Sequence, residues 1–143
     1  MWLAIAITAL ALGLGVWMAA RFGFALPWDG DVQRGTPTAI VALHDHLARQ
    51  GIATRVRLVR TEQAGAQARA IFSTTTAPEQ SFFVVWFGQA GTAASYAVEL
   101  NAGARTLVAD ANGPLLLMLP EAVRDSALAQ PLVAAFRSHV AAP

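Results

Sequence analysis

Residues 81–87 read Ser-Phe-Phe-Val-Val-Trp-Phe, and this stretch decides the fold class that the sequence predicts. It is short, apolar at consecutive positions and rich in aromatic and β-branched residues, which is typical of a strand buried on both faces. Successive side chains of a strand point to opposite faces, so Phe82, Val84 and Trp86 share one face. We therefore expect this strand to lie in the middle of a sheet that is covered on both sides.

Further strands are predicted on both sides of this stretch. Residues 115–119, Leu-Leu-Leu-Met-Leu, form a second wholly apolar strand, and Asn112-Gly113 before it is a strong hairpin signal. Three more strands are predicted. In each of them, either polar and apolar residues alternate or turn signals flank an apolar run. These are residues 54–60, 66–73 and 105–110.

The segment at residues 95–100 is ambiguous. Tyr96, Val98 and Leu100 alternate with polar or small residues, which favours a strand. Thr92 as a cap and Gly103 as a stop would also suit a short helix. We expect a strand here, which brings the number of predicted strands to five or six.

Helices are predicted at both ends of this series of strands. Thr36-Pro37 is a favourable helix start, apolar residues then recur at helical spacing, and Gly51 ends the helix. Residues 121–140 form a closing helix that Pro131 kinks or splits. Because the connections are short, we expect an antiparallel sheet in a small α+β domain with a helix at each end.

An uncharged segment precedes this domain. Residues 2–20 are 19 residues without a charge, which as a helix measure about 28 Å, close to the ~30 Å hydrocarbon core of a bilayer. We expect a single transmembrane anchor with an interfacial segment over residues 1–28, a linker at 29–35 and the domain at 36–143. A cleaved secretory signal is the alternative, but no basic residue precedes the apolar stretch.

Two further expectations concern this segment. Small residues recur along one side of the predicted helix, and such a stripe allows close packing against another transmembrane helix. The stripe consists of Ala4, Thr8, Ala11, Gly15 and Ala19. Arginines follow the segment and none precedes it, which favours the cell inner membrane with the domain on the cytoplasmic rather than the periplasmic side.

Composition excludes several kinds of chemistry. The chain has 143 residues and a net charge of +1, with no cysteine and no lysine, which excludes disulfides, thiolate metal sites and Schiff bases. His44 and His46 point apart on a helix, so we expect no metal site there, with His44 at the core edge and His46 facing solvent. His139 near the C-terminus is expected to be a cation at a helix end. No nucleophile motif supports a triad from Ser126, His139 and Asp110.

Two candidate surfaces remain. Arg55, Arg57 and Arg60 form a candidate surface for an anionic partner, although a solvated strand face is the simpler interpretation. If both predicted helices cover the same face of the sheet, Phe82, Val84 and Trp86 form a partner-facing surface. One helix on each face is the alternative.

The sequence leads to one functional expectation and one alternative. We expect a non-catalytic accessory, assembly or stabilising subunit of a larger bacterial membrane protein complex, with a photosynthetic or respiratory electron-transfer complex as host. Its partners would be the transmembrane helices of that complex and the lipid bilayer, with no cofactor and no nucleic acid. The alternative is a membrane-tethered binding module for a small ligand, a lipid or a transient protein partner, which predicts a pocket between sheet and helix.

Overall fold

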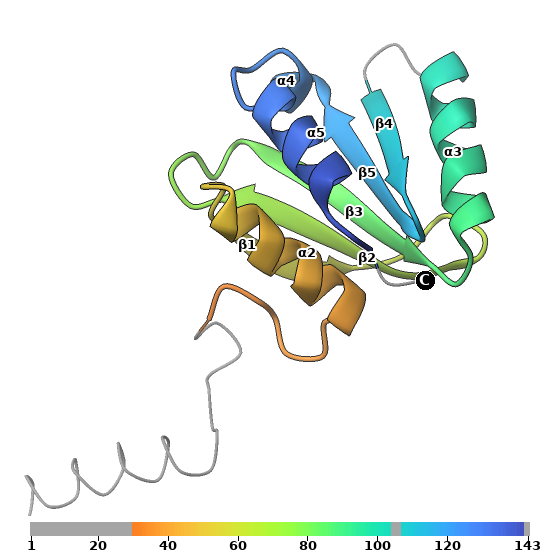
Figure 1. Cartoon of the computed structure of the whole chain (residues 1–143), viewed down its shortest axis with the longest axis horizontal. Coiled ribbons are helices and arrows are strands. Elements are labelled where there is room, and N and C mark those ends of the chain that lie inside the picture. Colours follow the sequence, from red (N-terminus) through yellow and green to blue (C-terminus); the bar gives the residue numbers. More distant parts are fainter. Residues whose placement is uncertain (1–29, 104–106, 142–143) are drawn as a thin grey trace, which may run out of the picture. The chain divides into compact units, whose positions relative to one another are not determined.

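The fold was obtained as a computed structural model, which describes residues 30–103 and 107–141 (Figure 1). Helices and strands follow one another in an order that places a helix between the third and fourth strands. The elements are α2 (Thr38–Arg49), β1 (Thr54–Val59), β2 (Ala66–Thr74), β3 (Ser81–Phe87), α3 (Ala90–Gly103), β4 (Leu107–Asn112), β5 (Leu115–Pro120), α4 (Glu121–Arg124) and α5 (Ala129–Ser138).

The five strands form one sheet in the order β1-β2-β3-β5-β4, and all neighbours are antiparallel. The central strand is β3, as the sequence Ser81–Phe87 predicts. After β3 the chain passes through α3 to the edge strand β4, and the predicted hairpin at Asn112-Gly113 returns it to β5 beside β3. Gly113 has φ +55°, a conformation that this tight turn requires and that glycine adopts without strain.

One face of the sheet carries the main core. Helices α2, α4 and α5 lie on this side, and Figure 1 shows α2 and α5 in front of the sheet. The large side chains that are fully buried here come from both helices and strands. They include Ile40, Leu43, Leu47, Phe72, Phe82, Leu115, Leu117, Leu132 and Phe136.

Helix α3 packs on the opposite face, so the prediction of a strand at residues 95–100 was wrong. Ala93 and Ala97 are buried against β3, β4 and β5, whereas Val98 is 71% exposed. An alternating strand would have placed Val98 beside Tyr96 and Leu100. The physical reason is tertiary: β3 and β5 are apolar on this face too, and a helix with small residues covers them closely.

The closing helix is split, as predicted, but the break lies before Pro131. Helix α4 ends at Arg124 and α5 begins at Ala129. Pro131 is the third residue of α5, where the missing N–H would have no partner within the helix. Proline is therefore tolerated here and does not kink the helix.

The fold class predicted from the sequence needs correction. Within residues 30–103 and 107–141, no helix combines the length and the apolar character needed to cross a membrane. The predicted transmembrane helix at residues 2–20, with its stripe of small residues, lies outside the described residues. Helices lie at both ends of the series of strands, as predicted, but an additional helix, α3, lies between β3 and β4. The structure supports an α+β domain with a five-stranded antiparallel sheet.

The end of the predicted linker is part of the domain. The chain divides into two units between Gly30 and Asp31. Directly after this point, Val32 forms a parallel bridge with Val56 of β1. The Val56 N–H donates to the carbonyl oxygen of Asp31 at 2.6 Å, and the Gln33 N–H donates to that of Val56 at 2.9 Å. The chain therefore enters the domain along the outer edge of β1.

Candidate functional site

A cavity of about 290 Å³ lies between the N-terminal half of α2, the sheet and the segment after α5. The space exists because several of the lining residues are alanines, whose side chain is a single methyl group. The lining consists of Thr38, Ala39, Ala42, Trp86, Pro114, Leu115, His139, Val140 and Ala141. It contains no Asp, Glu or Arg, so the cavity is uncharged when His139 is neutral.

His139 is the polar group buried most deeply in this wall. It is 9% exposed, and its ring centroid lies 5.1 Å from that of His46 on α2. Burial, followed by the nearby His46 and Arg49, lowers the pKa of His139 below its ordinary value. Desolvation thus opposes the positive charge that was expected for His139 at the helix end.

The position of His139 is set by the end of α5. The helix stops at Ser138, and His139 has extended backbone angles, φ −69° and ψ 130°. Asn112 in the β4–β5 hairpin donates from Nδ2 to the carbonyl oxygens of Phe136 at 2.8 Å and His139 at 2.6 Å. The hairpin thus terminates α5 and holds the wall of the cavity.

The two histidines of α2 both serve structural roles. His44 donates from Nε2 to the carbonyl oxygen of Thr54 at 3.0 Å and lies at the core edge, as expected. His46 donates from Nε2 to the carbonyl oxygen of Ala135 at 2.9 Å, so the expectation that it faces solvent was wrong. Among the residues that the structure describes, no group of three or more metal-binding side chains is arranged around a common point.

The three residues considered for a catalytic triad, Ser126, His139 and Asp110, each contact a different partner. Asp110 accepts from Arg137 Nε at 2.7 Å, and Ser126 donates to the carbonyl oxygen of Val123 at 2.6 Å. The ring of His139 contacts His46 instead.

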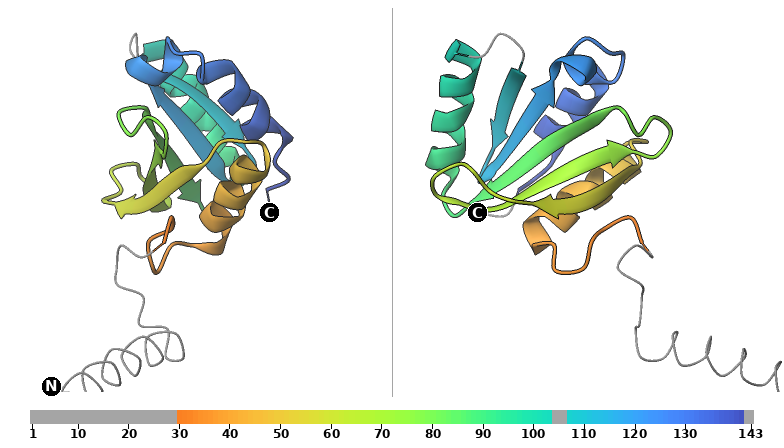
Figure 2. Two further views of the ribbon diagram at one scale, coloured as in Figure 1. Left: turned by 90° about the vertical axis from the view of Figure 1, so that its left-hand side faces the viewer. Right: turned by 180° about the vertical axis from the view of Figure 1, so that it is seen from behind.

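A second surface of interest is the part of the sheet that α3 leaves open. Helix α3 packs on β4, β5 and β3, and the rear view in Figure 2 shows no described helix over β1 and β2. We call this the open face. Two cross-strand rows form it, Arg55–Ser73–Ser81 and Arg57–Ile71–Phe83.

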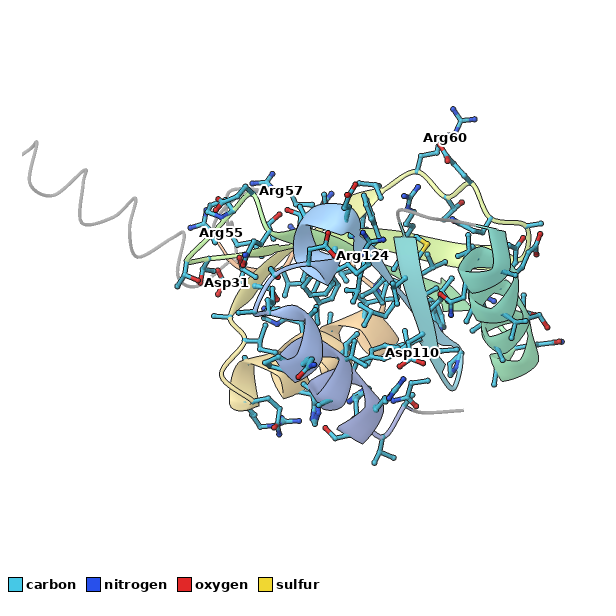
Figure 3. The ribbon with its side chains drawn as sticks, turned by 90° about the horizontal axis from the view of Figure 1, so that it is seen from above. Asp31, Arg55, Arg57, Arg60, Asp110 and Arg124 are labelled. Carbon is cyan, nitrogen blue, oxygen red and sulfur yellow. The ribbon has the colours of Figure 1, made fainter. Side chains whose placement is uncertain are left out.

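The open face carries a positive charge that its acidic neighbours only partly offset. Arg55 and Arg57 lie together beside Asp31, and Arg60 projects away from the domain (Figure 3). The distance from Arg55 Nε to Asp31 Oδ1 is 3.9 Å, and both side chains are well exposed, at 66% and 60%. Such an exposed ion pair contributes little to the free energy of unfolding. It therefore leaves Arg55, together with the neighbouring exposed Arg57, able to contact another molecule.

Arg69 sits differently from these three arginines. Its side chain is 17% exposed, and its guanidinium lies 4.3 Å from the centroid of the Phe83 ring. Glu62, in the loop between β1 and β2, lies 3.8 Å from Arg69. This stacked pair gives the middle of the open face an ordered aromatic and cationic surface.

The sheet surface expected at Phe82, Val84 and Trp86 is not a surface. Phe82 and Val84 have no exposed area, and Trp86 is half-buried against the main core. Helices α2, α4 and α5 pack on this face and form the main core with it. The less covered residues are on the opposite face, where Phe83 is half-buried.

A shallow groove between β4 and α5 is a weaker candidate for a binding site. Its volume is about 320 Å³, and Arg124 and Arg137 are among the residues that line it. Arg137 pairs with Asp110, and Arg124 donates from Nε to Asp125 Oδ1 at 3.0 Å (Figure 3). This hydrogen bond from Arg124 also lowers the pKa of Asp125.

The comparisons with known proteins do not assign this chain. No known protein family, no curated protein and no solved structure matches it. The function is therefore argued from the cavity and the open face. The sequence had pointed to Arg55, Arg57 and Arg60, but it did not identify the residues that line the cavity, which come from four distant parts of the chain.

Proposed function

We propose that this protein is a non-catalytic accessory subunit of a larger membrane protein complex, and that the open face is its docking surface. The observation that supports the proposal is the exposed pair Arg55 and Arg57 near the half-buried Phe83, on the part of the sheet face that α3 does not cover. Arginine and aromatic residues are the types enriched in protein interfaces.

The partner that fits this face is a protein with an acidic patch. The face combines guanidinium groups at its edge with serine hydroxyls and an apolar centre at Ile71 and Phe83. Such a mixture matches a polar rim around a small apolar core. The charge favours association with an acidic surface and sets the orientation of docking.

The membrane location of the partner is proposed from the uncharged residues 2–20 alone. The domain begins at Asp31, on the edge of β1 beside Arg55. The uncharged residues 2–20 end eleven residues before Asp31, which corresponds to at most about 40 Å of extended chain.

The first test is extraction of the full chain from native membranes in a mild detergent, followed by size separation and mass spectrometry. We expect co-migration in a large, stoichiometric complex. Reversing both charges, Arg55→Glu with Arg57→Glu, is expected to weaken this association roughly tenfold, and added salt to weaken the wild-type association.

Arg49→Glu is the matched control. Arg49 is an exposed arginine at the end of α2, on the side of the sheet away from the open face. We expect the Arg49 variant to co-migrate like the wild type. Migration of the wild-type chain alone would overturn the proposal. Binding of the chain to anionic lipid vesicles, with the same loss on Arg57→Glu and no protein companion, would replace the protein partner by a lipid surface.

A second candidate function is a binding module for a small ligand. The specific observation is the cavity beside His139, which lies between α2 and the sheet. Its test is ligand binding by the isolated full chain, which does not depend on any protein companion.

A further inference from the structure

The cavity beside His139 has the composition of a binding site for a small molecule. Its volume of about 290 Å³ lies near the lower end of the usual range for ligand pockets, and apolar cavities about half as large take up benzene. Trp86 and Leu115 form an apolar wall from β3 and β5, and Ala39 and Ala42 form the helical wall. A single ring with a few substituents fits this space.

Polar groups without a protein partner converge on the cavity. The ring of His139 is nine-tenths buried and contacts His46, but its nitrogens have no hydrogen-bond partner among the residues that the structure describes. The hydroxyl of the exposed Thr38 and the indole N–H of the half-buried Trp86 line the same space, and they too have no hydrogen-bond partner among the described residues. These polar atoms are accessible to water, and a ligand oxygen can take the place of a water molecule that hydrogen-bonds to them.

The charge of the wall limits the class of ligand. None of the nine lining residues is acidic or basic apart from His139. A charged ligand would lose its hydration in this wall without gaining an opposite charge, which is unfavourable. A neutral imidazole can donate to or accept from a hydroxyl or carbonyl oxygen.

We propose that this cavity binds a small uncharged ring molecule that carries a hydroxyl or carbonyl oxygen, with that oxygen hydrogen-bonded to the imidazole of His139. The ring packs against Trp86 and Leu115, and Ala42 leaves room for it beside α2. This proposal specifies the second candidate function and does not depend on the open face.

The test uses the full chain with Trp2, Trp17 and Trp28 changed to Phe, so that Trp86 is the only tryptophan left of four. Its fluorescence is titrated with phenol, with toluene and with benzoate. We expect saturable binding of phenol, binding of toluene about threefold to tenfold weaker because one hydrogen bond is lost, and no saturable binding of benzoate.

Two variants separate hydrogen bonding from packing. His139→Phe keeps a ring in the wall and is expected to abolish the preference for phenol over toluene while toluene still binds. Ala42→Leu fills the space and is expected to prevent binding of both. Ala48→Leu is the control, because Ala48 is an exposed alanine of the same helix that does not line the cavity.

Three results would overturn the proposal. Equal affinity for phenol and toluene in the wild type would show that His139 makes no hydrogen bond to the ligand. The strongest binding by benzoate would point to an anion site. No saturable response to any probe would remove the site, and it would leave the docking proposal untouched, since co-migration is measured separately.

Discussion

The imidazoles of His46 and His139 join α2 to α5 at a centroid distance of 5.1 Å. Because burial lowers the pKa of His139 from its ordinary value of 6.5, the unfolded chain binds more protons than the folded chain between the lowered pKa and pH 6.5. The free energy of unfolding therefore rises with pH through this window. The contribution of His139 is fully present above pH 6.5 and is lost as the pH falls through the window.

Because the free energy of unfolding rises with pH through the burial of His139, this single residue contributes to the difference in stability between about pH 5.5 and 7.5. We expect the wild-type chain to be less stable in urea at about pH 5.5 than at about pH 7.5, and His139→Phe to lose less stability between the two. His44→Gln is the control, because a glutamine can still donate to the Thr54 carbonyl oxygen and His139 is unchanged. Equal losses in the wild type and His139→Phe would contradict the role of burial at His139.

At the scale of the elements, side-chain amides occupy part of both sheet edges. Asn101 of α3 donates to the carbonyl oxygen of Ala109 on β4 at 2.8 Å and accepts from the Ala109 N–H at 2.8 Å. On β1, Gln33 Oε1 accepts from the Leu58 N–H at 2.8 Å. Exposed edges invite pairing with another chain. These amides make strand addition unfavourable, which leaves the open face as the better docking surface.

The Asn101 amide predicts a local and a global effect. Asn101→Ala is expected to lower the free energy of unfolding by about 1–3 kcal/mol and to speed hydrogen exchange at the Ala109 amide, because both backbone groups lose a partner. Glu99→Ala, an exposed change on the same helix, is expected to stay within about 0.5 kcal/mol. Chemical denaturation and exchange measured by NMR check both. Similar values for the two variants would contradict a role for Asn101 in holding β4.

At the scale of the whole molecule, the two faces of the sheet are unequal. The face under α2, α4 and α5 holds the larger cluster, whereas α3 covers only part of the other face. Phe82 and Phe83 are adjacent in the sequence but belong to different faces. Phe82 has no exposed area and stacks with Phe72 at 5.2 Å, whereas Phe83 is half-buried beneath Arg69.

This asymmetry predicts different costs for two neighbouring substitutions. Phe82→Ala is expected to lower the free energy of unfolding by about 3–5 kcal/mol, and Phe83→Ala by less than about half of that, because less buried area is lost. If Phe82→Ala prevents folding, Phe82→Leu and Phe83→Leu give the same comparison with smaller changes. Equal losses at the two positions would contradict an open face.

Much of the sheet was predictable because its signals are local. The apolar runs at Ser81–Phe87 and Leu115–Pro120 and the Asn112-Gly113 turn define β3, β5 and the hairpin without any distant contact. The site was less predictable. The arginines of β1 were visible as an alternating pattern, whereas the cavity needs Thr38, Trp86 and His139 to meet, and no local pattern carries that information.

The sequence by itself determined the α+β class of the domain, the positions of β1, β2, β3 and β5, and the helices at both ends, because strand period, turn residues and helix stops act over a few residues. Only the tertiary structure decided that residues 95–100 are helical, since the apolar second face of β3 and β5 required a cover. It also decided which face stays open and that His139 is buried. These outcomes depend on packing between distant segments, which the local pattern does not encode.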